Sequence, residues 1–91
     1  MYILNAFSLQ MVGMPSTVKF TEVNELPQGL VSAIGHVDTA HVLGFEPNRI
    51  NVFLEKGDVA FVAQLVGGRL PEGSTTLPEG FHFKFIKVEV V

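Results

Sequence analysis

The sequence predicts a small α/β (α+β) domain, built as a mixed sheet of about five strands with short flanking helices. Three observations carry this prediction. The 91 residues leave no room for a second core, so we expect one domain over residues 1–91. Hydrophobic residues make up 47% of the chain, and charged residues only 16%. Several segments alternate apolar and polar residues, which is the period of a half-buried strand.

The first part of the chain predicts two strands and a short helix. Residues 2–4 begin an apolar strand, and the polar Asn5 and Ser8 stand where the chain is expected to leave the sheet. Residues 17–23 alternate as a second strand. After a turn at residues 26–29 (LPQG), we expect a short helix over residues 30–34.

A junction of Gly35 and His36 precedes the second expected helix. Glycine lets the backbone turn in conformations closed to other residues. A cap at Asp38 or Thr39 would then open the helix, which we expect to end near Gly44. A histidine held at such a junction suits acid catalysis on a phosphate ester. An isolated histidine after a glycine is, however, more often a capping residue.

The second half of the chain is more regular. Residues 49–55 predict a strand, and residues 56–58 a tight hairpin connection to the next strand. Residues 59–66 are almost continuously apolar, which indicates a central strand buried on both faces. A loop dense in glycine and charge covers residues 67–73, and residues 81–91 alternate as the last strand.

Composition excludes several classes of function. A net charge of -3 argues against a protein that coats DNA or RNA, since such binding neutralises many phosphates. The chain has no cysteine, so it has neither a disulfide framework nor a thiolate metal site. The first residues show no signal-peptide or membrane-span pattern, and we expect a cytoplasmic protein. A small chain that is this apolar is expected to cover part of its apolar surface with a second copy of itself, so we expect a homodimer.

Polar residues in loops and at strand ends predict a pocket for an anionic nucleotide. A histidine can donate a proton near neutral pH, arginines give paired donors to phosphate oxygens, and amides and hydroxyls add hydrogen bonds. The residues of this set are Asn5, Ser8, His36, Arg49, Gln64, Arg69 and Glu72.

Structural roles stay open for the charged members of this set. Arg49 can form a surface ion pair with Glu46 or Glu55, which is the usual outcome. Glu72 can simply flank a turn that begins at a proline. Arg69 is the stronger functional candidate, because the two glycines before it let a ligand approach the backbone.

Two further combinations of residues could form a site. His36, Asp38 and His41 could form a metal site, but a gap of five does not put both imidazoles on one helical face. We therefore expect no metal and no cofactor. Ser8 with His36 could act as nucleophile and base, but no third member is evident.

Five short blocks follow one another over nearly the whole chain: 2–8 (YILNAFS), 34–36 (IGH), 48–49 (NR), Gln64, and 69–73 (RLPEG). In this order they resemble the viral ring nucleases, which are type III anti-CRISPR proteins with relatives in bacteria. The resemblance implies a dimer that binds cyclic tetra-adenylate across its interface and cuts it, without metal, to linear di-adenylate. That cleavage switches off the defence nucleases of the host.

The resemblance also implies roles for individual residues. His36 would be the general acid, Arg69 would stabilise charge at the phosphorus, and Glu72 would lie near the site. The residues implied to bind the ligand are Asn5, Ser8, Arg49, Gln64 and Arg69. The chain departs from the family pattern at Val37, where an acidic residue is expected, and in a longer spacing from Gln64 to Arg69. It also has a loop over residues 73–81 where some members carry a helix, which predicts a more open pocket.

Two other functions stay open at the level of sequence. The first is a protein of the same fold that sequesters a cyclic oligoadenylate without cutting it. The second is a small structural or regulatory viral protein that binds a protein partner through a phenylalanine-rich face.

Overall fold

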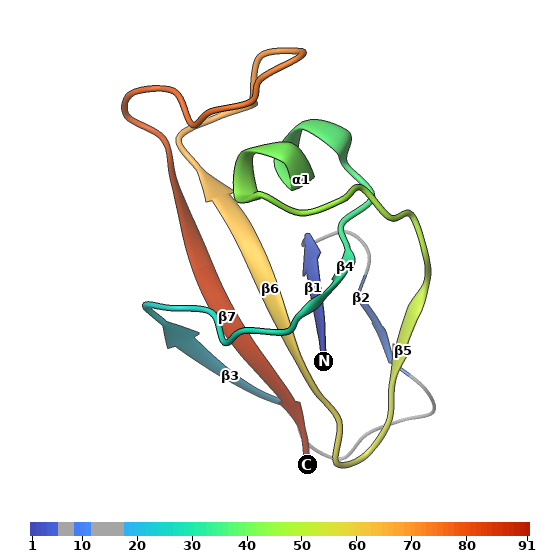
Figure 1. Ribbon diagram of the computed structural model, residues 1–91. Helices are drawn as coiled ribbons and strands as arrows, with labels where there is room; N and C mark the ends of the chain where they lie inside the picture. Colours follow the sequence, from blue (N-terminus) through green and yellow to red (C-terminus); the bar gives the residue numbers. More distant parts are fainter. Residues whose placement is uncertain (6–8, 12–17) are drawn as a thin grey trace.

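The computed structural model describes residues 1–5, 9–11 and 18–91. These residues form a five-stranded mixed sheet, a two-stranded sheet and one short helix (Figure 1), which confirms the predicted fold class. The large sheet has the order β3-β7-β6-β1-β4, with β1 (Tyr2–Asn5), β3 (Val18–Val23), β4 (Val31–Ala33), β6 (Val59–Val66) and β7 (His82–Val90). The small sheet pairs β2 (Leu9–Met11) with β5 (Val52–Leu54), and the helix α1 spans Val37–Leu43.

Strand β1 lies between β4 and β6 and runs parallel to both, with Leu4 opposite Ala33 on one side and Val62 on the other. The carboxyl ends of these three strands therefore meet at one edge of the sheet. Strand β7 is antiparallel to β6, from Val59 opposite Glu89 to Val66 opposite His82. The expected central position of residues 59–66 is confirmed, because β6 has a neighbour on each side.

The sheet is covered on both faces, and alternate residues of each strand pack into two different clusters. On the α1 face lie Ile3, Ile34, Ala40, Phe61 and Ala63, with Phe83 and Phe85 packed against them. The other cluster holds Leu4, Ala33, Val52, Leu54, Ala60, Val62, Val88 and Val90. The phenylalanines of β7 thus contribute to the core, and Phe83 and Phe85 stack with ring centroids 6.3 Å apart.

The expected helix over residues 30–34 is wrong, because Val31–Ala33 form the strand β4. Val31 lies opposite Tyr2 of β1, and its amide donates to the carbonyl of Met1 at 2.9 Å. Five residues, four of them apolar, are too few to distinguish the helical period from the strand period, so pairing with the distant strand β1 decided the conformation.

The expected hairpin between residues 49–55 and 59–66 is also wrong. The turn exists, with Gly57 at φ 91°, but β5 pairs in parallel with β2. Strand β6 already has β1 and β7 as neighbours, so it has no free edge to offer β5. The observed strand is shorter than expected and covers only Val52–Leu54.

Helix α1 begins earlier than Asp38 or Thr39, since His36 is its N-cap. Its expected end is confirmed, because Gly44 adopts the left-handed conformation at φ 82°. Among the described residues, no helix has the length and apolar character needed to span a membrane.

Candidate functional site

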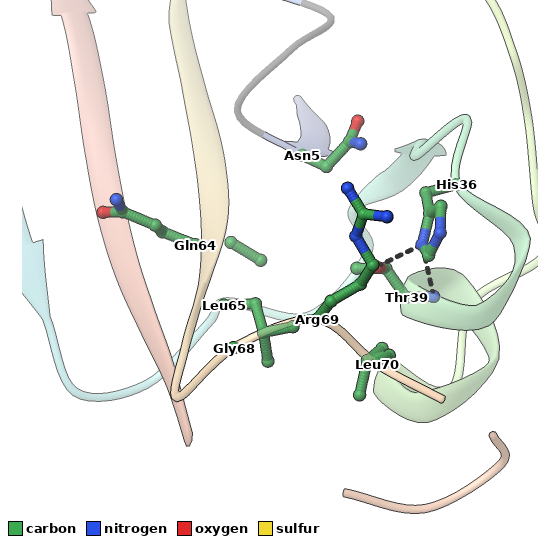
Figure 2. Close-up of a pocket in the computed structure, with 9 residues that line it drawn as sticks. Asn5, His36, Thr39, Gln64, Leu65, Gly68, Arg69 and Leu70 are labelled. Atoms are coloured by element: carbon green, nitrogen blue, oxygen red, sulfur yellow. Dashed lines mark hydrogen bonds between the residues drawn. The ribbon is translucent and has the colours of Figure 1, made fainter. Parts of the chain in front are cut away.

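A cleft lies at the edge where the parallel strands end, and its volume is about 640 Å³ (Figure 2). This volume falls in the range of roughly 300–1,000 Å³ that small-molecule sites occupy. The cleft is lined by Asn5, His36, Thr39, Ala63, Gln64, Leu65, Gly68, Arg69 and Leu70. Sheets with parallel strands commonly bind ligands at this edge, because the chain leaves each strand there in a loop.

Asn5 is the last residue of β1, and it follows Ile3 in the alternation that faces α1. Figure 2 shows its side chain beside the guanidinium of Arg69, with the ring of His36 on the other side of that guanidinium. These three residues lie more than thirty positions apart in the chain and converge because three different strands, β1, β4 and β6, end at the same edge.

His36 has extended backbone (φ -81°, ψ 114°), and its side chain turns back onto the first turn of α1. Its Nδ1 accepts a hydrogen bond from the Thr39 amide at 3.2 Å and lies 2.7 Å from the Thr39 hydroxyl. The side chain is exposed, and its Nε2 makes no hydrogen bond within the described part of the chain. One ring nitrogen is therefore bonded to the helix, and the other has no hydrogen-bond partner among the described residues.

Gly35 does not need the special backbone freedom that the sequence suggested, since its φ is not positive. A Cβ there would stand 3.4 Å from Cγ of Arg49, which is ordinary van der Waals contact, so the packing does not require a glycine at this position either. Arg49 thus lies against Gly35 and is not among the residues that line the cleft. Its expected ion pair with Glu46 or Glu55 is absent; the ion pair of the described residues joins Lys87 to Glu89.

Arg69 comes from the loop that follows β6, and its guanidinium lies between Asn5 and His36 (Figure 2). The two glycines before it have φ values of 121° and 133°. A Cβ at Gly67 would stand 3.0 Å from the carbonyl oxygen of Gly80, so this glycine serves the packing of the loop rather than the approach of a ligand. Leu70 is buried next to Arg69 and holds the loop against the domain.

The other sequence-predicted residues are placed less centrally. Gln64 is exposed, and Figure 2 shows its side chain directed away from Asn5, His36 and Arg69. Glu72 is exposed in the loop after β6 and does not line the cleft. Ser8 lies outside the described residues.

Thr39 is a site residue that the sequence pattern predicted only as a helix cap. Thr39 lines the cleft, is 7% exposed, and contacts the ring of His36 through both its hydroxyl and its amide. The available signal was a threonine three residues after a histidine, which is the spacing of an N-cap bond.

A hydrogen bond joins the loop after β6 to the helix, since the Gly73 amide donates to Oδ2 of Asp38 at 3.3 Å. The residues considered for a metal do not cluster: no three His, Cys, Asp or Glu side chains come together in residues 1–5, 9–11 and 18–91.

Comparison with known families places the chain. Residues 1–85 match the STIV B116-like family. The chain belongs to that family. The match spans every candidate site residue from Asn5 to Glu72. One relative of this STIV B116-like protein is the uncharacterized protein ORF116 of Acidianus filamentous virus 1 (isolate United States/Yellowstone).

The two proteins are 34% identical over an alignment of 94 residues, gaps included. The alignment covers 86% of this chain and 78% of the viral protein. The STIV B116-like family is therefore one that viruses encode, as the sequence suggested.

Proposed function

We propose that this STIV B116-like protein is a metal-independent ring nuclease that cuts cyclic tetra-adenylate into linear di-adenylate with 2′,3′-cyclic phosphate ends. The observation that supports the proposal best is the meeting of Asn5, His36 and Arg69 at one cleft. A proton donor, a cation and an amide are the groups that transesterification of a phosphodiester requires.

The proposed reaction is an in-line displacement at phosphorus. The ribose 2′-oxygen forms a bond to the adjacent phosphorus, its proton leaves to solvent, and the bond to the 5′-oxygen breaks. His36 gives a proton from Nε2 to the departing 5′-oxygen. Arg69 stabilises the negative charge on the phosphorane oxygens, and Asn5 orients the sugar-phosphate by hydrogen bonding.

A homodimer completes the proposal. One cleft holds one His36, whereas two di-adenylates arise only when opposite linkages of the ring are cut. A two-fold dimer supplies two equivalent histidines. Large apolar side chains exposed on the protomer support such an association, with Phe20 on β3 at 64% exposure and Phe53 on β5 at 55%. We expect the dimer to act in the cytoplasm of the host cell.

Ser8, Arg49, Gln64 and Glu72 keep the roles that the resemblance implies, as part of the proposal. Arg49 and Glu72 do not line the cleft of their own protomer, and Gln64 points away from its centre, so their contacts would be to parts of the ring that extend beyond it. Glu72→Gln, compared with wild type, tests whether the carboxylate takes part in cutting or only in binding.

A sequestering protein is the second candidate, and one observation favours it. The side chain of His36 caps α1, so a histidine at this position has a structural reason that requires no catalysis. Under this alternative the cleft binds the ring and releases it unchanged.

The deciding experiment incubates the protein with cyclic tetra-adenylate in EDTA and identifies products by chromatography and mass. The matched variants are His36→Ala and His36→Asn, because asparagine can still cap the helix but cannot donate an acidic proton. We expect both variants to bind the ring and to cut it about 10²–10⁴-fold more slowly than wild type. Binding without cutting by wild type would establish the sequestering protein, and absence of both would reject each proposal.

A further inference from the structure

Thr39 presents two different hydrogen-bonding groups to one atom of His36. The Thr39 amide lies 3.2 Å from Nδ1, and the Thr39 hydroxyl oxygen lies 2.7 Å from the same nitrogen. Thr39 is itself nearly buried within the first turn of α1. Its position is therefore fixed by the helix, whereas the ring of His36 is exposed and depends on Thr39 for its orientation.

The two groups impose different conditions on the ring. An amide can only donate, so its bond to Nδ1 requires a lone pair on that nitrogen. Neutral His36 must then carry its proton on Nε2. A hydroxyl can donate or accept, so it can donate to bare Nδ1 and accept from Nδ1–H once the ring is charged.

We propose that the Thr39 hydroxyl is the positioning group of His36 and holds the ring in one orientation in both of its charge states. When the charged ring gives its Nε2 proton to the leaving group, the neutral ring that results carries its proton on Nδ1, and the hydroxyl can accept from Nδ1–H both before and after that transfer. The ring then returns to the Nε2–H tautomer by taking up a proton at Nε2 and losing the one at Nδ1. The Thr39 amide alone could not hold the ring through these steps, because a donor cannot face Nδ1–H. The expected effect on catalysis rests on the proposed ring-nuclease function. The tautomer and the orientation of the His36 ring do not depend on that function.

The charged side chains on the elements around His36 stay constant in the test. They are Arg69 in the loop after β6, Arg49 before β5, and Asp38 on α1, whose carboxylate accepts the Gly73 amide. Only the group at residue 39 is changed. Thr39→Val removes the hydroxyl and preserves the branched shape and the amide, whereas Thr39→Ser restores a hydroxyl at the same atom.

The first measurement is long-range ¹H–¹⁵N NMR of His36 in the free protein. Wild type should show the Nε2–H tautomer when the ring is neutral, and ring contacts to residue 39 in both charge states. Thr39→Val should keep the tautomer but lose those contacts when the ring is charged, and Thr39→Ser should regain them. An Nδ1–H tautomer in wild type, or unchanged contacts in Thr39→Val, would overturn the inference without any reference to activity.

The second measurement is turnover of cyclic tetra-adenylate. Thr39→Val should lower kcat about 10-fold with KM nearly unchanged, and Thr39→Ser should restore it, because positioning of an acid affects the chemical step rather than binding. An unchanged kcat in a Thr39→Val protein that has lost the ring contacts would overturn the expected effect on catalysis. If wild type cuts nothing, the proposed function fails while the NMR result still decides how Thr39 acts.

Discussion

The two ends of the parallel strands each carry a cavity, and the cavities differ in chemistry. The cleft at the carboxyl ends gathers Asn5, His36 and Arg69 (Figure 2). The cavity at the opposite end has a volume of about 390 Å³ and is lined by Met1, Tyr2, Val52, Phe53, Leu54, Gly57, Asp58 and Val59. Asp58 is the charged residue of that lining, and its carboxylate accepts the Glu55 amide at 2.8 Å.

The difference follows from where the backbone hydrogen bonds go. At the opposite end the turn is closed onto β7, since the Gly57 amide donates to the carbonyl of Val90 and the Val90 amide to that of Asp58. At the carboxyl edge the chain leaves the sheet in loops, and the His36 side chain there bonds to Thr39 of α1 rather than to the sheet. One end is therefore closed by backbone hydrogen bonds, and the other carries polar side chains around a cleft.

The largest loss of stability is expected in the buried core of β1, the strand that joins the two ends. Leu4 lies in the middle of β1 and is fully buried, so Leu4→Ala should lower the free energy of unfolding by about 2–5 kcal/mol. Glu25→Ala, at an exposed side chain in the bend after β3, should change it by no more than about 0.5 kcal/mol. Denaturant titration measures both, and equal losses would contradict the assignment of the core.

The next largest effect is a loss of ligand affinity, which should differ between two arginines. Arg69→Ala should weaken binding of cyclic tetra-adenylate about 10–100-fold, because a hydrogen bond to a charged group contributes about 1.5–3 kcal/mol. Arg49→Ala should weaken it far less, since Arg49 lies against Gly35 outside the cleft. Calorimetry on a His36→Asn background measures both affinities. Equal losses would show that Arg49 contributes as much to binding the ring as Arg69 does, and would contradict this ranking of the two arginines.

Two glycines with positive φ, one at each end of the parallel strands, should differ in how much stability they lose on substitution by alanine. Gly57→Ala meets no atom within 4 Å, so it should cost only backbone strain of about 1 kcal/mol. Gly67→Ala adds a Cβ 3.0 Å from the Gly80 oxygen and should cost about 2–3 kcal/mol. Thermal unfolding compares the two variants, and a Gly57→Ala loss as large as that of Gly67→Ala would refute the packing argument.

The smallest effect is expected at the contact between the loop and the helix. Asp38→Ala removes the acceptor of the Gly73 amide and should cost about 0.5–1 kcal/mol. Hydrogen exchange should accelerate at Gly73 and remain unchanged in β6. Asp58→Ala is the control at the other end, where exchange should accelerate at Glu55 instead. Acceleration throughout the domain would show that the contact supports the whole fold rather than the loop.

The elements with strong local patterns were predictable from the sequence. Residues 59–66 and 82–90 are strands because long apolar or alternating segments bury whole faces, and Gly44 ends α1 because its left-handed conformation suits glycine. The sequence also indicated that Asn5, His36 and Arg69 belong to one polar set.

Other features depended on partners distant in the chain. Val31–Ala33 became a strand because β1 offered a free edge, and β5 paired with β2 because β6 had none. No local pattern encodes which edges stay free, since that depends on the order of all the strands.

In the candidate site, too, some features follow from the sequence and others from contacts between distant parts of the chain. The sequence by itself determined the chemistry available to this protein: an acid, a cation and an amide in loops, in a small apolar domain without cysteine. Only the tertiary structure decided that Asn5, His36 and Arg69 meet, that Gln64 turns away, and that Thr39 holds the histidine. The physical reason is that residue type fixes what a side chain can do, whereas strand direction and pairing fix which side chains share a cleft.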